Sequence, residues 1–87
     1  MLKLRREVRG VALEDIHLAT KIRLETLENI ESDRYEALPD ATFLRNHLIQ
    51  YARIVGLDPK ETVEQYLANY IEWRKRRIQA EAPERKK

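Results

Sequence analysis

The sequence has 87 residues, a mass of 10.4 kDa and a formal net charge of +2. A chain of this length forms one small domain, whose core is too small to surround an elaborate active site. It contains no cysteine, which excludes disulfides, thiol nucleophiles and cysteine-ligated metals. With 43% hydrophobic residues, 37% charged residues and two glycines, the composition is typical of a small helical protein with a charged surface.

The charges are distributed unevenly along the chain. Residues 1–10 and 71–87 are basic, whereas residues 11–40 carry eight acidic and three basic side chains. The isoelectric point near 9.0 therefore arises from the two ends, and the middle of the chain is acidic. For this reason the overall charge does not by itself indicate a nucleic-acid-binding protein.

The first part of the chain predicts three short helices. The first covers Leu2–Arg9 and stops at Gly10, because glycine readily adopts the left-handed conformation that closes a helix. Apolar residues at three-residue spacing predict a second helix over Leu13–Thr20. After a break near Lys21, the same spacing predicts a third helix that runs to Ile30 and ends before Arg34.

A fourth helix is predicted after a short connection. We expect Tyr35–Pro39 to be extended, because the residue before a proline avoids the helical conformation. Asp40 is placed to cap a helix that runs to Val55 and is closed by Gly56. The predicted inward face consists of Leu44, Leu48, Tyr51 and Val55.

The clearest local pattern starts the fifth helix. Asp58 can cap it, Pro59 suits its first turn, and Glu61 completes a capping box. Its predicted inward residues are Val63, Tyr66, Leu67, Tyr70, Ile71 and Trp73. The chain is thus predicted to be all-α, with a folded five-helix domain over residues 1–78 and a charged, disordered tail over residues 79–87.

Three short helices with a tight connection between the second and third describe a helix-turn-helix. The sequence over about Leu2–Tyr70 resembles the cytoplasmic helix-turn-helix domain of the RodZ family, within the Xre/Cro-repressor-like superfamily. The segments that carry the resemblance are Ala19–Ile22, Tyr35–Pro39, Tyr51–Arg53 and Gly56–Pro59. The resemblance implies a five-helix domain that docks on the bacterial actin-like protein MreB in cell-shape control.

In that family a transmembrane helix usually follows a basic juxtamembrane segment. Arg74, Lys75, Arg76 and Arg77 supply such a segment here, and no stretch of this chain approaches the ~20 apolar residues that span a bilayer. We therefore expect a cytoplasmic domain, which is either a domain that lies at the inner face of the membrane in a parent protein, a relative that lost the anchor, or a module of a different multidomain protein. Any membrane contact would then depend on a segment absent from this chain.

Three positions depart from the family pattern. Ala12 stands where the family has a serine or threonine cap, which removes a hydrogen bond worth about 1 kcal/mol. His17 replaces a small alanine that faces the third helix, and its larger ring is expected to prevent a close helix crossing. His47 replaces a phenylalanine of the fourth helix.

The resemblance also implies a protein-binding surface on the fourth helix. Its aromatic pair, four residues apart, corresponds to His47 and Tyr51, with Phe43 one turn before them. Tyr51 fits two interpretations equally, because a tyrosine with a surface hydroxyl serves either a core or an interface. Leu18, next to His17 on the second helix, either extends this surface or is one of the scattered apolar residues found on most proteins.

The alternative function is DNA binding through the third helix. The candidate DNA contacts are Lys21, Arg23, Thr26 and Asn29. From residue 22 to residue 33, however, one basic side chain stands against four acidic ones. Because affinity for DNA depends on neutralising phosphates, this charge favours protein binding over DNA binding.

The remaining patterns concern the fifth helix and catalysis. Trp73 lies beside the basic segment at 74–77, which fits either an anchor on an acidic membrane surface or, as we favour for the isolated chain, a solvated helix end. The single serine, Ser32, has no histidine near it in sequence, and His17 and His47 are thirty residues apart and form no His-x-x-x-His pair. We therefore expect a non-enzymatic protein with no catalytic residue, no metal and no cofactor.

Overall fold

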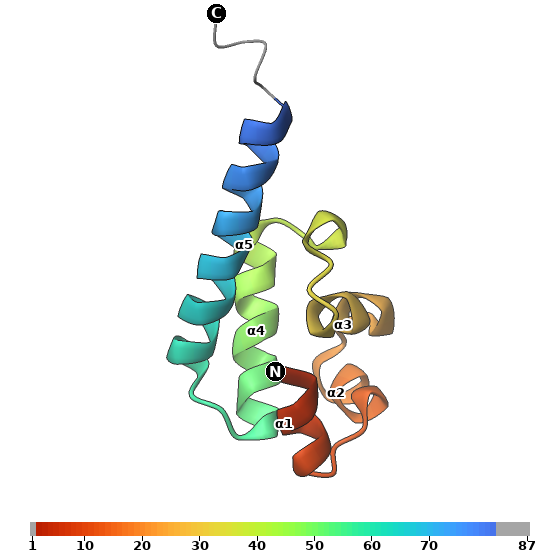
Figure 1. Cartoon of the computed structure of the whole chain (residues 1–87). Coiled ribbons are helices and arrows are strands. Elements are labelled where there is room, and N and C mark those ends of the chain that lie inside the picture. The colour runs from red at the N-terminus through yellow and green to blue at the C-terminus, as the bar shows by residue number, and fades with distance from the viewer. Residues whose placement is uncertain (1, 82–87) are drawn as a thin grey trace, which may run out of the picture.

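The computed structural model describes residues 2–81, which contain five α-helices and no strand. The elements are α1 (Leu2–Val8), α2 (Leu13–Thr20), α3 (Leu24–Glu31), a 3-10 turn η1 (Tyr35–Ala37), α4 (Ala41–Val55) and α5 (Pro59–Glu81). Figure 1 shows α4 in the middle of the molecule, with α5 along one side and α2 and α3 on the other. The all-α fold predicted from the sequence is confirmed.

Helices α4 and α5 form a long antiparallel hairpin, and local sequence defines its ends. The Asp40 side chain accepts hydrogen bonds from the backbone N–H groups of Thr42 and Phe43, which confirms the predicted cap of α4. Gly56 closes α4 in the left-handed conformation, with φ of 80°. Asp58 accepts from the N–H of Lys60 and so starts α5 after a very short connection.

Helices α2 and α3 form the helix-turn-helix. The predicted break is at Lys21, which has a φ of 66° and whose N–H donates to the His17 carbonyl. As expected from Ala12, the start of α2 has no cap from a side chain at that position. Asp15 makes one of the two hydrogen bonds of a capping box, because its carboxylate accepts from the Ala12 N–H over 3.1 Å.

Four boundaries or faces differ from the sequence predictions. Tyr35–Ala37 forms a 3-10 turn instead of an extended segment, and only then does Leu38 become extended before the proline. The first helix ends at Val8, one residue early. On α5, Ile71 is 51% exposed instead of inward-facing. The same helix continues to Glu81, past the predicted end of the folded domain at 78; residues 82–87 of the predicted tail lie outside the described residues.

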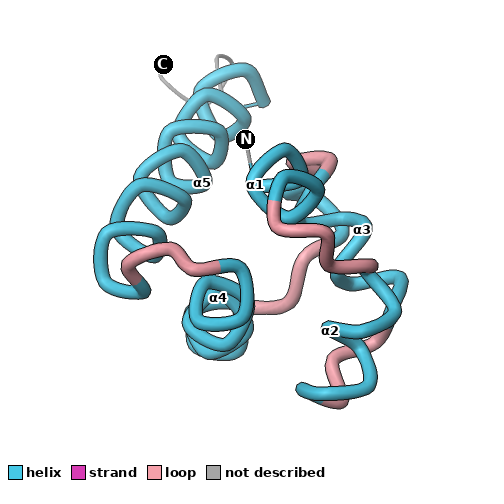
Figure 2. The backbone as a smooth tube through the Cα atoms, turned by 90° about the horizontal axis from the view of Figure 1, so that it is seen from below, coloured by secondary structure: helices cyan, strands magenta, loops and turns pink. Residues whose placement is uncertain are grey.

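The core consists of two clusters that meet along α4. One joins the helix-turn-helix to the C-terminal half of α4 and contains Ile16, Ile22, Leu27, Tyr51 and Val55. The other joins α3 and the N-terminal half of α4 to α5 and contains Ile30, Leu44, Leu48, Val63 and Tyr66. Figure 2, seen from below, shows that α1 lies over the space between α5 and α3. Because α4 contributes to both clusters, it connects the helix-turn-helix to α5.

Candidate functional site

Phe43 and His47 lie together on one flank of α4. The helix buries Leu44, Leu48, Tyr51, Ala52 and Val55, and the four-residue spacing places Phe43 and His47 beside this buried stripe. Phe43, the single phenylalanine of the chain, is 61% exposed. This pair forms an aromatic surface, which we call the α4 flank.

His47 is half-buried and has a polar atom without a partner. Its Nδ1 is shielded from solvent and forms no hydrogen bond with any described residue. Burial lowers the pKa of His47, because a charged imidazolium would lose its hydration there. His47 is therefore neutral near pH 7, and its ring can enter an apolar contact at a smaller desolvation cost than an imidazolium.

The structure decides between the two interpretations of Tyr51. This residue is fully buried, so its predicted role as an interface residue is wrong and the core interpretation holds. Its hydroxyl lies 2.5 Å from a Glu31 carboxylate oxygen and 3.1 Å from the Leu2 carbonyl. Burial, followed by the hydrogen bond to Glu31, raises the pKa of Tyr51. Tyr51 thus supports the α4 flank from inside.

Arg6 completes this buried polar network. Its Nε donates to Glu31 over 2.6 Å, a second guanidinium nitrogen donates to the other carboxylate oxygen over 3.0 Å, and a third bond reaches the Val11 carbonyl. The hydrogen bond with Glu31 raises the pKa of Arg6. The network joins α1, α3 and α4, and neither Arg6 nor the inward position of Glu31 was predicted from the sequence.

The two predicted residues of α2 do not join the α4 flank. His17 turns toward the connection between α2 and α3, where its Nδ1 lies 2.6 Å from the Ile22 carbonyl; since a carbonyl only accepts, the ring proton is on Nδ1. The ring therefore holds the turn closed. Leu18 is 66% exposed and lies across α2 from the buried Ile16, so it points away from α4.

Helix α3 exposes a surface with mixed charge. Lys21 and Arg23 are exposed at its start, and Thr26 and Asn29 are half-buried on it. Of the four acidic residues counted from the sequence, Glu31 is withdrawn into the buried network, but Glu25, Glu28 and Asp33 remain exposed. Lys21 and Arg23 are thus accessible, Thr26 and Asn29 are partly so, and exposed acidic side chains lie on the same helix.

The far half of α5 is held by aromatic contacts. Tyr35 of η1 packs against Tyr66, Tyr70 and Trp73, with ring centroids 5.6 to 6.0 Å apart. The guanidinium carbon of Arg77 lies 5.5 Å from the Trp73 ring centroid, a cation–π contact. Arg74, Lys75, Arg76 and Arg77 are all exposed, and Arg76 lies 3.7 Å from Glu72. Trp73 therefore packs within the protein on one side and borders a basic surface on the other.

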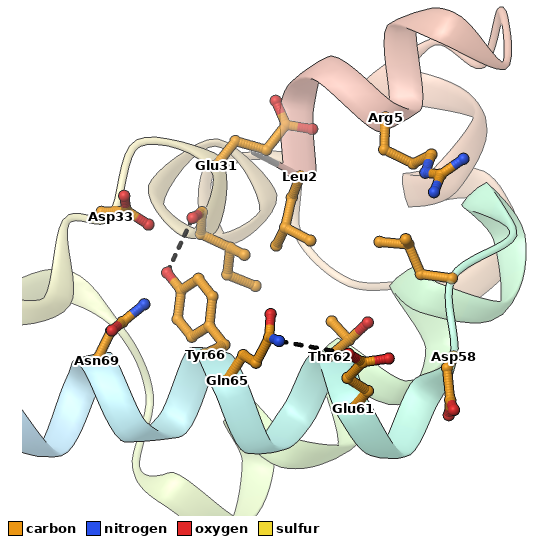
Figure 3. Close-up of a pocket in the computed structure, with 12 residues that line it drawn as sticks. Leu2, Arg5, Glu31, Asp33, Asp58, Glu61, Thr62, Gln65, Tyr66 and Asn69 are labelled. Carbon is orange, nitrogen blue, oxygen red and sulfur yellow. Dashed lines mark hydrogen bonds between the residues drawn. The ribbon is translucent and has the colours of Figure 1, made fainter.

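A cleft between α1 and α5 was not expected from the sequence. It encloses about 370 Å³, and Figure 3 shows Arg5, Asp58 and Glu61 at one end and Asp33 and Asn69 toward the other. At its base the Tyr66 hydroxyl donates to the Ile30 carbonyl over 2.8 Å. No group of three or more His, Asp or Glu side chains with a geometry suited to a metal occurs within residues 2–81.

Comparison with known proteins agrees with this architecture. A family model described as a helix-turn-helix domain matches residues 1–62. The chain belongs to this family. It is 33% identical over 66 residues to the cytoskeleton protein RodZ of Streptococcus pneumoniae, and 34% identical over 56 residues to an uncharacterised membrane protein, YmfM, of Bacillus subtilis. These findings confirm the resemblance to RodZ-like domains.

The chain corresponds to only part of these relatives. The matches cover 76% and 64% of this chain but 24% of the RodZ relative and 19% of YmfM. No solved structure matches the chain. Within residues 2–81, no helix is both long and apolar enough to cross a membrane.

Proposed function

We propose that this domain is a non-enzymatic protein-interaction module of a cytoskeletal, RodZ-like protein. It docks on an actin-like filament protein of the MreB type through the α4 flank, and it works at the inner face of a membrane. Similarity to a RodZ protein and to a membrane protein supports this proposal. The basic segment at 74–77 would direct the domain toward an anionic membrane surface or toward a following segment.

The exposure of Phe43 is the observation that carries the proposal. A phenylalanine that is 61% exposed on a rigid helix offers a large apolar area at little conformational cost. His47 extends that area by one turn in its neutral form. The Asp40 cap and the buried Tyr51 hold the helix beneath these side chains, so the surface is preformed.

The charge of α3 argues against DNA as the main partner. A recognition helix approaches a duplex that carries about one charge per 1.7 Å of its axis. Here Glu25 and Glu28 remain on the exposed side of α3, and Lys21 and Arg23 do little more than balance them. Without a net positive charge the helix neutralises few phosphates, so DNA binding stays the second choice.

A filament cosedimentation experiment tests the proposal. Phe43→Ala should weaken binding to polymerised MreB-type protein roughly tenfold, because burying an aromatic ring at an interface centre contributes more than 1 kcal/mol. Leu4→Ala is the matched control, because Leu4 is equally exposed, at 63%, but lies on α1. Equal binding by Phe43→Ala, Leu4→Ala and the unmodified chain would reject the α4 flank.

Fluorescence polarisation with mixed-sequence duplexes tests the alternative. Protein docking through apolar side chains should change little with salt, whereas DNA binding through Lys21 and Arg23 should weaken steeply. Micromolar or tighter DNA affinity at physiological salt, lost in Arg23→Ala, would reverse our choice.

A further inference from the structure

A basic groove lies on the outer side of the α4–α5 hairpin. Arg45, Ile49 and Arg53 follow one another at four-residue spacing along α4, and Lys60 and Val63 face them from the first turns of α5. The space between them is about 360 Å³. This stripe of α4 lies on the opposite side of the helix from Phe43 and His47, so the groove is separate from the α4 flank.

The groove has cationic edges and an apolar floor. Arg45, Arg53 and Lys60 are exposed, and no ion pair among residues 2–81 involves any of them. Glu64 is the one acidic residue of the lining. Lys60 also lies in the first turn of α5, where the helix dipole disfavours a cation, so its charge does not serve the stability of that helix. Ile49 and Val63 supply the apolar floor.

The same chain carries a surface of complementary chemistry on α2 and α3. Glu14 and Leu18 are neighbours, four residues apart on the exposed side of α2. Leu18 is 66% exposed, and Glu25 and Glu28 are exposed on the adjoining α3. Lys21 and Arg23, between α2 and α3, are exposed as well, so the surface as a whole has mixed charge. Its acidic part, formed by Glu14, Glu25 and Glu28, is called the acidic face here; with the exposed Leu18 it offers the carboxylates and the apolar side chain that an apolar floor between cations would take.

We propose that the acidic face of one copy docks in the basic groove of a second copy, with Leu18 against Ile49 and with Glu14 and Glu25 facing Arg45 and Arg53. Figures 1 and 2 show α5 and the α2–α3 pair on opposite sides of α4. The acidic face of one copy therefore cannot reach the basic groove of the same copy. The contact joins two different surfaces of two copies and so runs head to tail. A head-to-tail contact that does not close into a ring builds a row of copies.

The contact uses the basic groove and the acidic face, neither of which contains Phe43 or His47. Because exposed charges carry most of the attraction, the association should be weak in solution and sensitive to salt. Its effect would grow where the domain is concentrated, as in a row of bound copies on a filament or a membrane. The proposal does not depend on the identity of the partner of the α4 flank.

Sedimentation velocity of the whole chain tests the contact. At up to about 1 mM protein and ~0.1 M salt, the mean mass should rise with concentration beyond that of a dimer, and at ~1 M salt it should return to the monomer. Arg45→Glu with Arg53→Glu should give a monomer. The matched control, Arg74→Glu with Lys75→Glu, makes the same charge change outside the groove and should associate like the unmodified chain.

A charge-swap experiment identifies the opposing face. Glu14→Lys with Glu25→Lys should also be monomeric, whereas an equimolar mixture of this variant with Arg45→Glu/Arg53→Glu should associate again. Leu18→Ala should weaken association roughly tenfold, while Leu4→Ala should leave it unchanged. Circular dichroism of each variant verifies that the helical fold is kept.

Two results would overturn the proposal. The first is a chain that stays monomeric at about 1 mM protein and ~0.1 M salt. The second is a mixture of the two charge-reversed variants that stays monomeric although each is folded. Flotation with vesicles of phosphatidylglycerol and phosphatidylcholine tests whether the groove binds anionic lipids. If the monomeric chain binds these vesicles and the binding requires Arg45 and Arg53, the groove is assigned to lipid headgroups instead.

Discussion

Glu31 is the last residue of α3, and its carboxylate joins three helices. Arg6 binds it through two nitrogens and the Tyr51 hydroxyl binds one of its oxygens. The side chains of Arg6 and Glu31 are only 11% and 5% exposed, so the ion pair is largely removed from water. A charge in this position is tolerated only while its partner is present, because an unpaired buried charge loses its hydration without compensation.

Glu31→Gln should therefore destabilise the fold strongly. We expect the free energy of unfolding to fall by about 3 kcal/mol, because the substitution leaves Arg6 without a counter-charge. Urea titration followed by circular dichroism measures the change. Glu28→Gln, on the exposed side of the same helix, is the control and should cost less than about 0.5 kcal/mol. If both variants lost the same free energy of unfolding, the buried ion pair would not make the proposed contribution to stability.

His47 gives a pH dependence whose sign follows from its environment. Burial lowers the pKa of His47 below its usual value of about 6.5, so the unfolded chain binds a proton at pH values where the folded chain does not. This contribution to stability is fully present at pH values above the pKa of His47 in the unfolded chain. It is lost as the pH falls through the lowered pKa of His47 in the folded chain. The urea midpoint should thus be lower at about pH 5 than at about pH 7.5.

The His47→Phe variant tests that assignment. The difference between the two urea midpoints should shrink in this variant, because phenylalanine has no proton to bind. A variant that keeps the full difference would place the pH dependence on other groups.

At the scale of elements, η1 packs against α5 although it is only three residues long. Tyr35 projects from it onto three aromatic residues of α5. Burial raises the pKa of Tyr35, which keeps its hydroxyl neutral. This contact ties the connection between α3 and α4 to the far half of α5, beyond the part of α5 that packs on α4 through Val63 and Tyr66.

Tyr35→Ala should loosen that half of α5. We expect a loss of about 2 kcal/mol in the free energy of unfolding, less than for a fully buried ring because Tyr35 is half-buried. The emission of Trp73, the single tryptophan, should shift to longer wavelength as its ring becomes more exposed to water. Tyr35→Phe keeps the ring and should leave the emission unchanged; a matching shift in both variants would exclude ring packing as the cause.

At the scale of the whole molecule, the shape is elongated because α5 is longer than its partner. The described residues extend 52 × 23 × 21 Å, and the 23 residues of α5 span about 34 Å. Beyond Trp73, the side chains from Arg74 to Ile78 are exposed. The basic segment thus lies on a projecting helix, at a distance from the helix-turn-helix.

Two truncations separate the folded unit from this projection. A chain that ends at Ile78 should keep the thermal midpoint of the full chain within about 2 °C, because the removed residues follow an exposed stretch. A chain that ends at Asn69 loses Tyr70 and Trp73 and should melt at least about 5 °C lower. Differential scanning calorimetry measures both. Equal midpoints in the two truncated chains would show that the aromatic contacts add nothing to stability.

The site was predicted less well than the fold. The four-residue spacing correctly aligned Phe43 and His47, because that relation lies within one helix. Tyr51 belongs to the same predicted stripe, but its environment depends on Glu31 and Leu2, which are 20 and 49 residues away in the chain. Leu18 was grouped with the wrong helix for the same reason: its neighbours are set by how α2 rotates against α4.

Local hydrogen bonds explain what the sequence alone determined about this protein. Asp40 and Asp58 start helices through hydrogen bonds to residues a few positions away, and Gly10 and Gly56 end helices in the same way. Their effects can therefore be inferred from the neighbouring residues in the sequence. Only the tertiary structure decided that Glu31 is buried, that Leu18 points away from α4, and that cations gather in a groove between α4 and α5. These features depend on contacts between distant segments, which arise when packed helices share one core.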